Sequence, residues 1–221
     1  MKAPRLKLIS FNLCPFVQRA RIALEEKELE HEIEYIDLDM PPDWFFDISP
    51  MEKVPVLLVD DKPLFESMVI CEFIDDISGN TLYPKDPFKR AQQRAWIALG
   101  DTMLGSVFNL KNASTESDFK RAKAAIIDKL DVLEEEMTDG PYFAGKQFGM
   151  VDIAYAPLFR ILTGITRYTG INFYADVPNV SAWAEQLLAT PAVKASVPDD
   201  FERVFEASLK RPDTAISKMI K

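Results

Sequence analysis

The chain has 221 residues, of which 48% are hydrophobic and 28% are charged. This balance is typical of a folded chain with a buried core, either one large domain or two small ones, and it excludes extended disorder. Lysine and arginine total 26 against 35 for aspartate and glutamate, which gives a net charge of −9. Without a segregated basic patch, we expect neither nucleic acid nor a membrane surface as a partner.

No apolar run in the sequence approaches the ~18 residues that a membrane helix needs. Arg5 and Lys7 fall where a secretory signal would have its apolar core. We therefore expect a cytoplasmic protein.

The cysteine and histidine content excludes several kinds of chemistry. Cys14 and Cys71 are the two cysteines, and their wide separation gives neither a disulfide framework nor a zinc cluster. His31 is the single histidine and lies among glutamates, as expected for a surface residue. There is no glycine-rich phosphate-binding motif, so the sequence predicts no metal and no bound nucleotide.

Apolar patterns divide the first 79 residues into a β-α-β unit and a β-β-α unit. Strand periodicity covers residues 5–10 and 32–37, with helical spacing over 17–24 between them. After a connecting segment at 42–49, residues 56–60 and 64–65 predict a hairpin. A helix follows from Ser67, ends at Gly79 and carries an apolar stripe of Val69, Ile70, Phe73, Ile74 and Ile77. This order predicts a thioredoxin-like domain over residues 1–79.

Helical periodicity continues through the rest of the chain, after a proline-containing linker at 80–88. Pro157 lies inside one of these helices and is expected to bend it. The apolar spacing predicts an all-α C-terminal domain over residues 89–221, with helices over 88–103, 119–137, 151–165, 181–188 and 201–209.

Cys14 follows the first predicted strand and begins the first predicted helix, with Pro15 where a missing N–H does no harm. A thiol at a helix N-terminus faces free N–H groups and the positive end of the helix dipole, which favour the thiolate. We therefore expect Cys14 to be a nucleophile whose pKa lies below the ordinary value of about 8.5. By position alone, a small core residue is an equally good interpretation.

Two further positions can present backbone or charged groups to a ligand. Val54-Pro55 precedes a predicted strand, and a cis bond there would turn the Val54 N–H and C=O toward a peptide ligand. At the start of the next helix, Ser67 can cap, the free N-terminus can hold a carboxylate and Glu66 can take an amino group. An ordinary strand start and an ordinary helix cap are the alternatives.

In this order and at these spacings, the motifs resemble the glutathione transferase superfamily over essentially the whole chain. The resemblance implies a thioredoxin-like domain followed by an all-helical domain, glutathione as co-substrate and a homodimer. It implies that Cys14 is the catalytic residue and Pro55 a cis-proline. It also assigns glutathione binding to Val54, Glu66 and Ser67.

The motifs look most like the omega class, in a bacterial protein of the cysteine type. The matching segments are Cys14-Pro-Phe-x-x-Arg19, Pro42-x-Trp44-Phe45-Phe46 and Glu66-Ser-x-x-x-Cys71-Glu72-Phe73. In that class a lysine that contacts glutathione stands where this chain has Pro41. We expect Lys53 to replace its charge.

A cysteine nucleophile implies glutathione-dependent thiol transfer or reduction, of the thioltransferase or dehydroascorbate reductase kind, through a mixed disulfide at Cys14. Without a C-x-x-C motif, a monothiol route is favoured. Conjugation is expected to be secondary, because Cys14 would compete with the bound thiol. The main alternative is a non-catalytic adaptor that resembles the stringent starvation proteins and binds RNA polymerase. The intracellular chloride channels, which share the Cys-Pro-Phe box, are a further alternative.

Two other residues are assigned to folding. Asp152 lies three residues after Gly149 at the expected start of a helix, where a carboxylate is favoured by the helix dipole. Cys71 is expected beside the apolar stripe of its helix, with a structural role.

Overall fold

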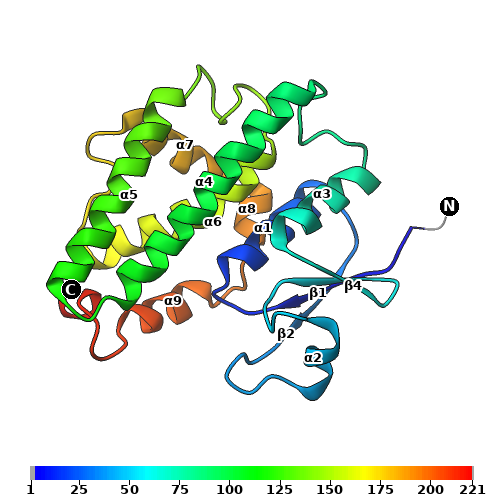
Figure 1. The fold of residues 1–221 in the computed structure, drawn as a ribbon, viewed down its shortest axis with the longest axis horizontal. Coiled ribbons are helices and arrows are strands. Elements are labelled where there is room, and N and C mark those ends of the chain that lie inside the picture. The colour runs from blue at the N-terminus through cyan, green and yellow to red at the C-terminus, as the bar shows by residue number, and fades with distance from the viewer. Residues whose placement is uncertain (1–2, 221) are drawn as a thin grey trace. The chain divides into compact units, whose positions relative to one another are not determined.

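The alternating apolar residues near the N-terminus form a four-stranded sheet in the computed structural model, which describes residues 3–220 (Figure 1). The strands are β1 (Leu6–Ser10), β2 (Glu32–Tyr35), β3 (Val56–Val59) and β4 (Lys62–Phe65). Their order is β2-β1-β3-β4. β1 is parallel to β2 and antiparallel to β3, and β3 and β4 form the expected hairpin.

Strand β1 is buried because it lies between β2 and β3 in the sheet and helices cover it. Leu8 is fully buried and stands opposite Ile33 of β2 and Leu57 of β3. Ile9 is also fully buried and stands opposite Val56. The predicted thioredoxin-like arrangement is therefore confirmed, with β1 as its core strand.

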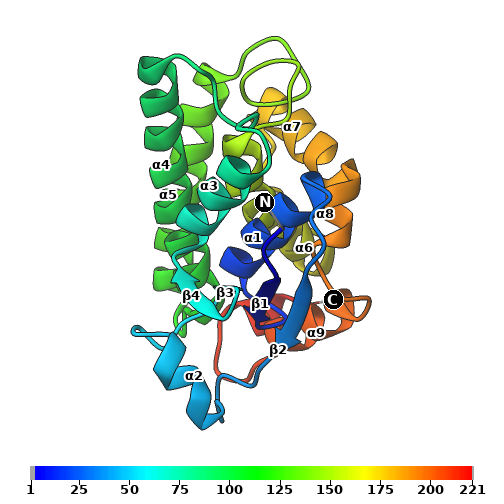
Figure 2. The ribbon, with the colours of Figure 1, turned by 90° about the vertical axis from the view of Figure 1, so that its right-hand side faces the viewer.

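Three helices accompany the sheet. α1 (Pro15–Glu26) and α3 (Ser67–Ile77) pack together on one face, and α2 (Asp43–Ile48) lies on the other side (Figures 1 and 2). The prediction of a mere connecting segment at 42–49 was wrong. Six helical residues are too few for a helical period to show in the sequence, although Phe45 anchors α2 with a buried ring.

The buried face of α3 differs from the predicted stripe. Val69 and Ile77 are 48% and 41% exposed, whereas Cys71 is fully buried. Asp75 also lies on the buried side of the helix, where its carboxylate pairs with the Lys27 ammonium group at 2.6 Å. Gly79 has φ of +111°, the left-handed conformation expected after a helix C-terminus.

The chain divides into two units that do not follow the predicted boundaries. The first unit ends at Thr81 and also includes Pro191–Asp199, and the second comprises Leu82–Thr190 and the chain from Asp200 onward. The later segment contains α8 (Pro191–Ala195), which packs on α1, where the Arg21 guanidinium donates to the Ala195 carbonyl at 2.6 Å. The prediction of one boundary, a linker at 80–88, did not include this later segment of the first unit. The last two residues of the predicted linker belong to α4.

The second unit is helical, as predicted. Its helices are α4 (Pro87–Asn112), α5 (Glu116–Glu136), α6 (Met150–Thr169), α7 (Pro178–Ala189), α9 (Phe201–Leu209) and a short 3₁₀ helix (Ile216–Met219). α4 and α5 pack along one another, and their N-termini are capped by Asp86 and Thr115. Pro157 lies inside α6 without ending it. Among the described residues, no helix is both long and apolar enough to cross a membrane.

Asp152 organises the start of α6. The residue is 1% exposed, and its carboxylate accepts from the Phe143 N–H at 3.0 Å, the Trp183 indole N–H at 2.7 Å and the Gly149 N–H at 2.8 Å. Burial raises the pKa of Asp152 to about 6, although these three donors act in the opposite direction. The contacts agree with the folding role expected for this residue.

We expect Asp152→Ala to lower the free energy of unfolding by about 3 kcal/mol, because three N–H donors, two of them buried, would lose their acceptor. Urea denaturation followed by circular dichroism measures this loss. Asp131→Ala, at an exposed position of α5, is the control and should change stability by less than about 0.5 kcal/mol. Equal stability of the two variants would contradict the prediction.

Candidate active site

Cys14 and Val54 meet because β1 and β3 are paired. The register places Ile9, near the end of β1, opposite Val56 at the start of β3, so the segments after β1 and before β3 lie at the same edge of the sheet. There the Cys14 thiol donates to the Val54 carbonyl, with a sulfur–oxygen distance of 3.7 Å. The Val54-Pro55 bond is cis, as the family resemblance implied.

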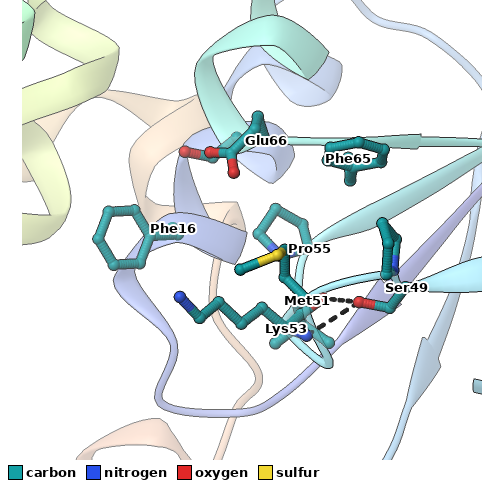
Figure 3. Close-up of a pocket in the computed structure, with 10 residues that line it drawn as sticks. Phe16, Ser49, Met51, Lys53, Pro55, Phe65 and Glu66 are labelled. Atoms are coloured by element: carbon teal, nitrogen blue, oxygen red, sulfur yellow. Dashed lines mark hydrogen bonds between the residues drawn. The ribbon is translucent and has the colours of Figure 1, made fainter. Parts of the chain in front are cut away.

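A pocket of about 170 Å³ opens beside this contact (Figure 3). All four residues predicted to bind glutathione line it, from the loop before β3 and from the start of α3. The lining residues are Phe16, Ser49, Pro50, Met51, Lys53, Val54, Pro55, Phe65, Glu66 and Ser67. Cys14 is not among these lining residues, but its thiol contacts Val54, which is one of them.

The start of α3 differs in one detail from the expected cap. Glu66, not Ser67, occupies the N-cap position, and its φ of 72° lies in the left-handed region that non-glycine residues rarely adopt. Ser67 is the first helical residue. Since the first intrahelical bond runs from the Ile70 N–H to the Glu66 carbonyl, the preceding N–H groups stay available to an anion.

Two opposite charges face the pocket without partners of their own. Within residues 3–220, neither the Lys53 ammonium group nor the Glu66 carboxylate forms an ion pair or a side-chain hydrogen bond. Figure 3 shows the ends of both side chains directed toward the same open space, with Phe16 at its side. A cation, a carboxylate and a helix N-terminus together complement a ligand that carries both charges.

The electrostatics of Cys14 correct the expectation from the sequence. Burial raises the pKa of Cys14 above its ordinary value, and the N–H groups of Val17 and Phe16 and the charge of Arg19 only partly offset this effect. The prediction of a pKa below that of an ordinary thiol was therefore wrong for the ligand-free protein. The helix N-terminus is present as expected, but removal of the thiolate from water outweighs it.

Family models and known relatives match most of the chain. Residues 13–77 match the N-terminal domain of glutathione S-transferases, and residues 112–186 match the C-terminal domain. "Glutathione S-transferase U19" of Arabidopsis thaliana is 33% identical over 202 residues, which cover 90% of this chain and 92% of the relative. The chain belongs to the glutathione S-transferase family.

Solved structures of other glutathione transferases support the family and leave the class open. A Tau class enzyme from mango has a TM-score of 0.83 and 30% identity, with coverage of 92% of this chain and 97% of the mango chain. Omega 3C from Trametes versicolor has a TM-score of 0.80 and 30% identity, covering 88% and 89%. The expectation of a bacterial omega-class protein is therefore met at the level of the family only.

The sequence did not single out several residues that line the pocket of this glutathione transferase. Phe16 lies within the Cys14-Pro-Phe motif and Phe65 directly precedes Glu66-Ser67, but neither was assigned a role at the site. Ser49, Pro50 and Met51 belong to the segment between α2 and β3, which carries no periodic pattern. The conformation of this loop places them in the lining of the same pocket as Lys53 and Glu66.

We expect the rate of Cys14 alkylation to rise with an apparent pKa above the ordinary thiol value of about 8.5, because burial disfavours the thiolate. Iodoacetamide rates between pH 6 and 11 measure it. Cys71 should stay silent, since it is fully buried and its pKa is raised to about 12. Cys14→Ser protein, which retains Cys71, is the control. An apparent Cys14 pKa below 8.5 would contradict the direction given by the structure.

Proposed function

We propose that this glutathione transferase catalyses glutathione-dependent thiol transfer with Cys14 as the nucleophile. The observation that carries the proposal is the Cys14 thiol, 3.7 Å from the carbonyl of Val54, which lines a pocket with an unpaired cation and an unpaired carboxylate. A thiol at that place can reach the sulfur of a peptide ligand bound along the loop before β3. The homodimer and the cytoplasmic location remain part of the proposal.

Glutathione fits this set of groups by charge and by backbone pattern. Its γ-glutamyl ammonium can pair with Glu66, and its α-carboxylate can accept from Ser67 and the free N–H groups of α3. Its glycine carboxylate can pair with Lys53. Val54, 7% exposed, has a backbone N–H without a hydrogen-bond partner in the described part of the chain, so an extended peptide can satisfy it.

The reaction balances as two thiol–disulfide exchanges. In the first, the Cys14 thiolate attacks the glutathione sulfur of a glutathionylated substrate, forming a Cys14–glutathione disulfide and releasing the substrate thiolate, which takes up a proton. In the second, the thiolate of another glutathione attacks the same glutathione sulfur, releasing glutathione disulfide and the Cys14 thiolate. In sum, the substrate disulfide is reduced to a thiol and one free glutathione is consumed, because the glutathione disulfide that leaves contains this glutathione and the one taken from the substrate.

The raised pKa of Cys14 sets the pH dependence of the first exchange. Only the thiolate attacks, and burial makes the thiolate scarce in the ligand-free protein at neutral pH. The rate of this step therefore increases with pH until the thiol is ionised. The charge of Arg19 and the N–H groups at the start of α1 stabilise the anion that forms.

The raised pKa of Cys14 and its hydrogen bond to the Val54 carbonyl favour conjugation as a second candidate function. A protonated Cys14 thiol can donate a hydrogen bond, as it does to the Val54 carbonyl. Directed at the sulfur of bound glutathione, this donor would stabilise the glutathione thiolate, which could then attack an electrophile. In that reaction Cys14 forms no covalent bond.

Cys14→Ser distinguishes the two functions. Thiol transfer to a glutathionylated peptide should fall to background, because serine is not a nucleophile at neutral pH. Conjugation to 1-chloro-2,4-dinitrobenzene should persist or increase, because a hydroxyl is the stronger hydrogen-bond donor. Both assays are measured on the same preparation. Full thiol transfer by the variant would overturn the catalytic assignment of Cys14.

We expect Lys53→Met and Glu66→Gln each to weaken glutathione binding by about 1.5–3 kcal/mol, roughly 10- to 100-fold, because each removes one charge-assisted contact. Isothermal titration calorimetry measures the affinities. Lys62→Met, at an exposed position of β4 outside the pocket, is the matched control and should bind as the parent does. Unchanged affinity in both pocket variants would mean that glutathione binds elsewhere, and no binding by the parent would favour the adaptor alternative.

A further inference from the structure

A single hydroxyl closes the loop between α2 and β3. The Ser49 hydroxyl donates to the Lys53 carbonyl and accepts from the Lys53 N–H, each at 2.9 Å. A hydroxyl can do both at once, so one side chain satisfies both polar backbone groups of Lys53. Ser49 is 2% exposed, whereas the residues from 50 to 53 are exposed.

The loop is anchored at Ser49 and turns sharply before Lys53. The Ser49 N–H donates to the carbonyl of Phe45, whose buried ring holds α2 in place. The Glu52 N–H donates to the Ser49 carbonyl, and Glu52 has φ of 54°, in the left-handed region. Because its exposed residues bury little apolar surface, the shape of this loop depends on its hydrogen bonds.

The clamp determines where the Lys53 charge is found. Figure 3 shows both bonds from Ser49 at the base of the Lys53 side chain, whose ammonium end reaches the space beside Phe16. A lysine side chain has high rotamer entropy, and a loose backbone beneath it would add to the entropy lost when a ligand orders it. A fixed backbone removes that additional loss.

We propose that Ser49 is a positioning residue for ligand binding, which acts by clamping the backbone of Lys53 and so holding the Lys53 ammonium group at the pocket. This inference rests on the proposed function, since it takes Lys53 as a contact of glutathione. Ser49 itself does not contact the ligand in this role. Its effect must therefore pass through Lys53.

A double-mutant cycle tests this dependence, with glutathione as the probe in calorimetry. Ser49→Ala should weaken binding about fivefold in the parent protein, because the clamp is lost. In the Lys53→Met background, Ser49→Ala should change the affinity by less than about 1.5-fold, since no ammonium group remains to be positioned. Ser78→Ala, which removes a side-chain bond to the Ile74 carbonyl at the far end of α3, is the control and should bind as the parent does.

Each outcome of the cycle decides between the parts of the proposal. Unchanged affinity in Ser49→Ala, or the same loss with and without Lys53, would overturn the role of Ser49 and leave glutathione binding intact. Failure of the parent to bind glutathione would overturn the proposed function, and this inference with it.

A measurement on the parent protein covers the case in which Ser49→Ala does not fold. In the ligand-free protein, the Lys53 amide should exchange with solvent at least about tenfold more slowly than the Met51 amide, which has no acceptor in the described residues. Amide exchange followed by NMR reports both. Equal rates would overturn the clamp directly.

Discussion

The antiparallel pairing of β1 with β3 is the constraint on which the site depends. Cys14 follows β1, and the Val54-Pro55 bond precedes β3, so the register of this pair sets the distance between the thiol and the Val54 carbonyl. A shift of one residue would turn the apolar side chains of either strand away from the core. Burial of Leu8 and Ile9 therefore fixes the geometry of a site to which neither residue contributes an atom.

The N-termini of α3 and α1 both offer free N–H groups to an anion, but they differ in how far water reaches them. At the start of α3, free N–H groups face an open pocket, and an anion can bind there while its outer side stays in water. At the start of α1, N–H groups face the thiol of a partly buried cysteine. There the loss of hydration outweighs the interaction with the helix, so burial determines the direction in which the Cys14 pKa shifts.

Many residues near the pocket could be predicted because they belong to short sequence motifs that determine the local structure. A cysteine before a helical proline, a Val-Pro before a strand and a Glu-Ser before a helix each have a local structural consequence. Their order added the family and hence the cis state of Pro55. Ser49 escaped prediction because a serine in an unpatterned loop has no local signature. Its structural role comes from hydrogen bonds to the backbone of Lys53, four residues later.

The sequence by itself determined the order of the strands and of the longer helices, the helical second half and the motif residues of the pocket, because periodicity and capping are encoded locally. It missed the short helices α2 and α8. It could not determine burial, which is a property of neighbours distant in the chain. Packing made Cys71 a core residue and brought Asp75 against Lys27, and burial raised the pKa of Cys14. The return of Pro191–Asp199 to the first unit was likewise decided by tertiary packing, since Arg21 and Ala195 share no pattern along the sequence.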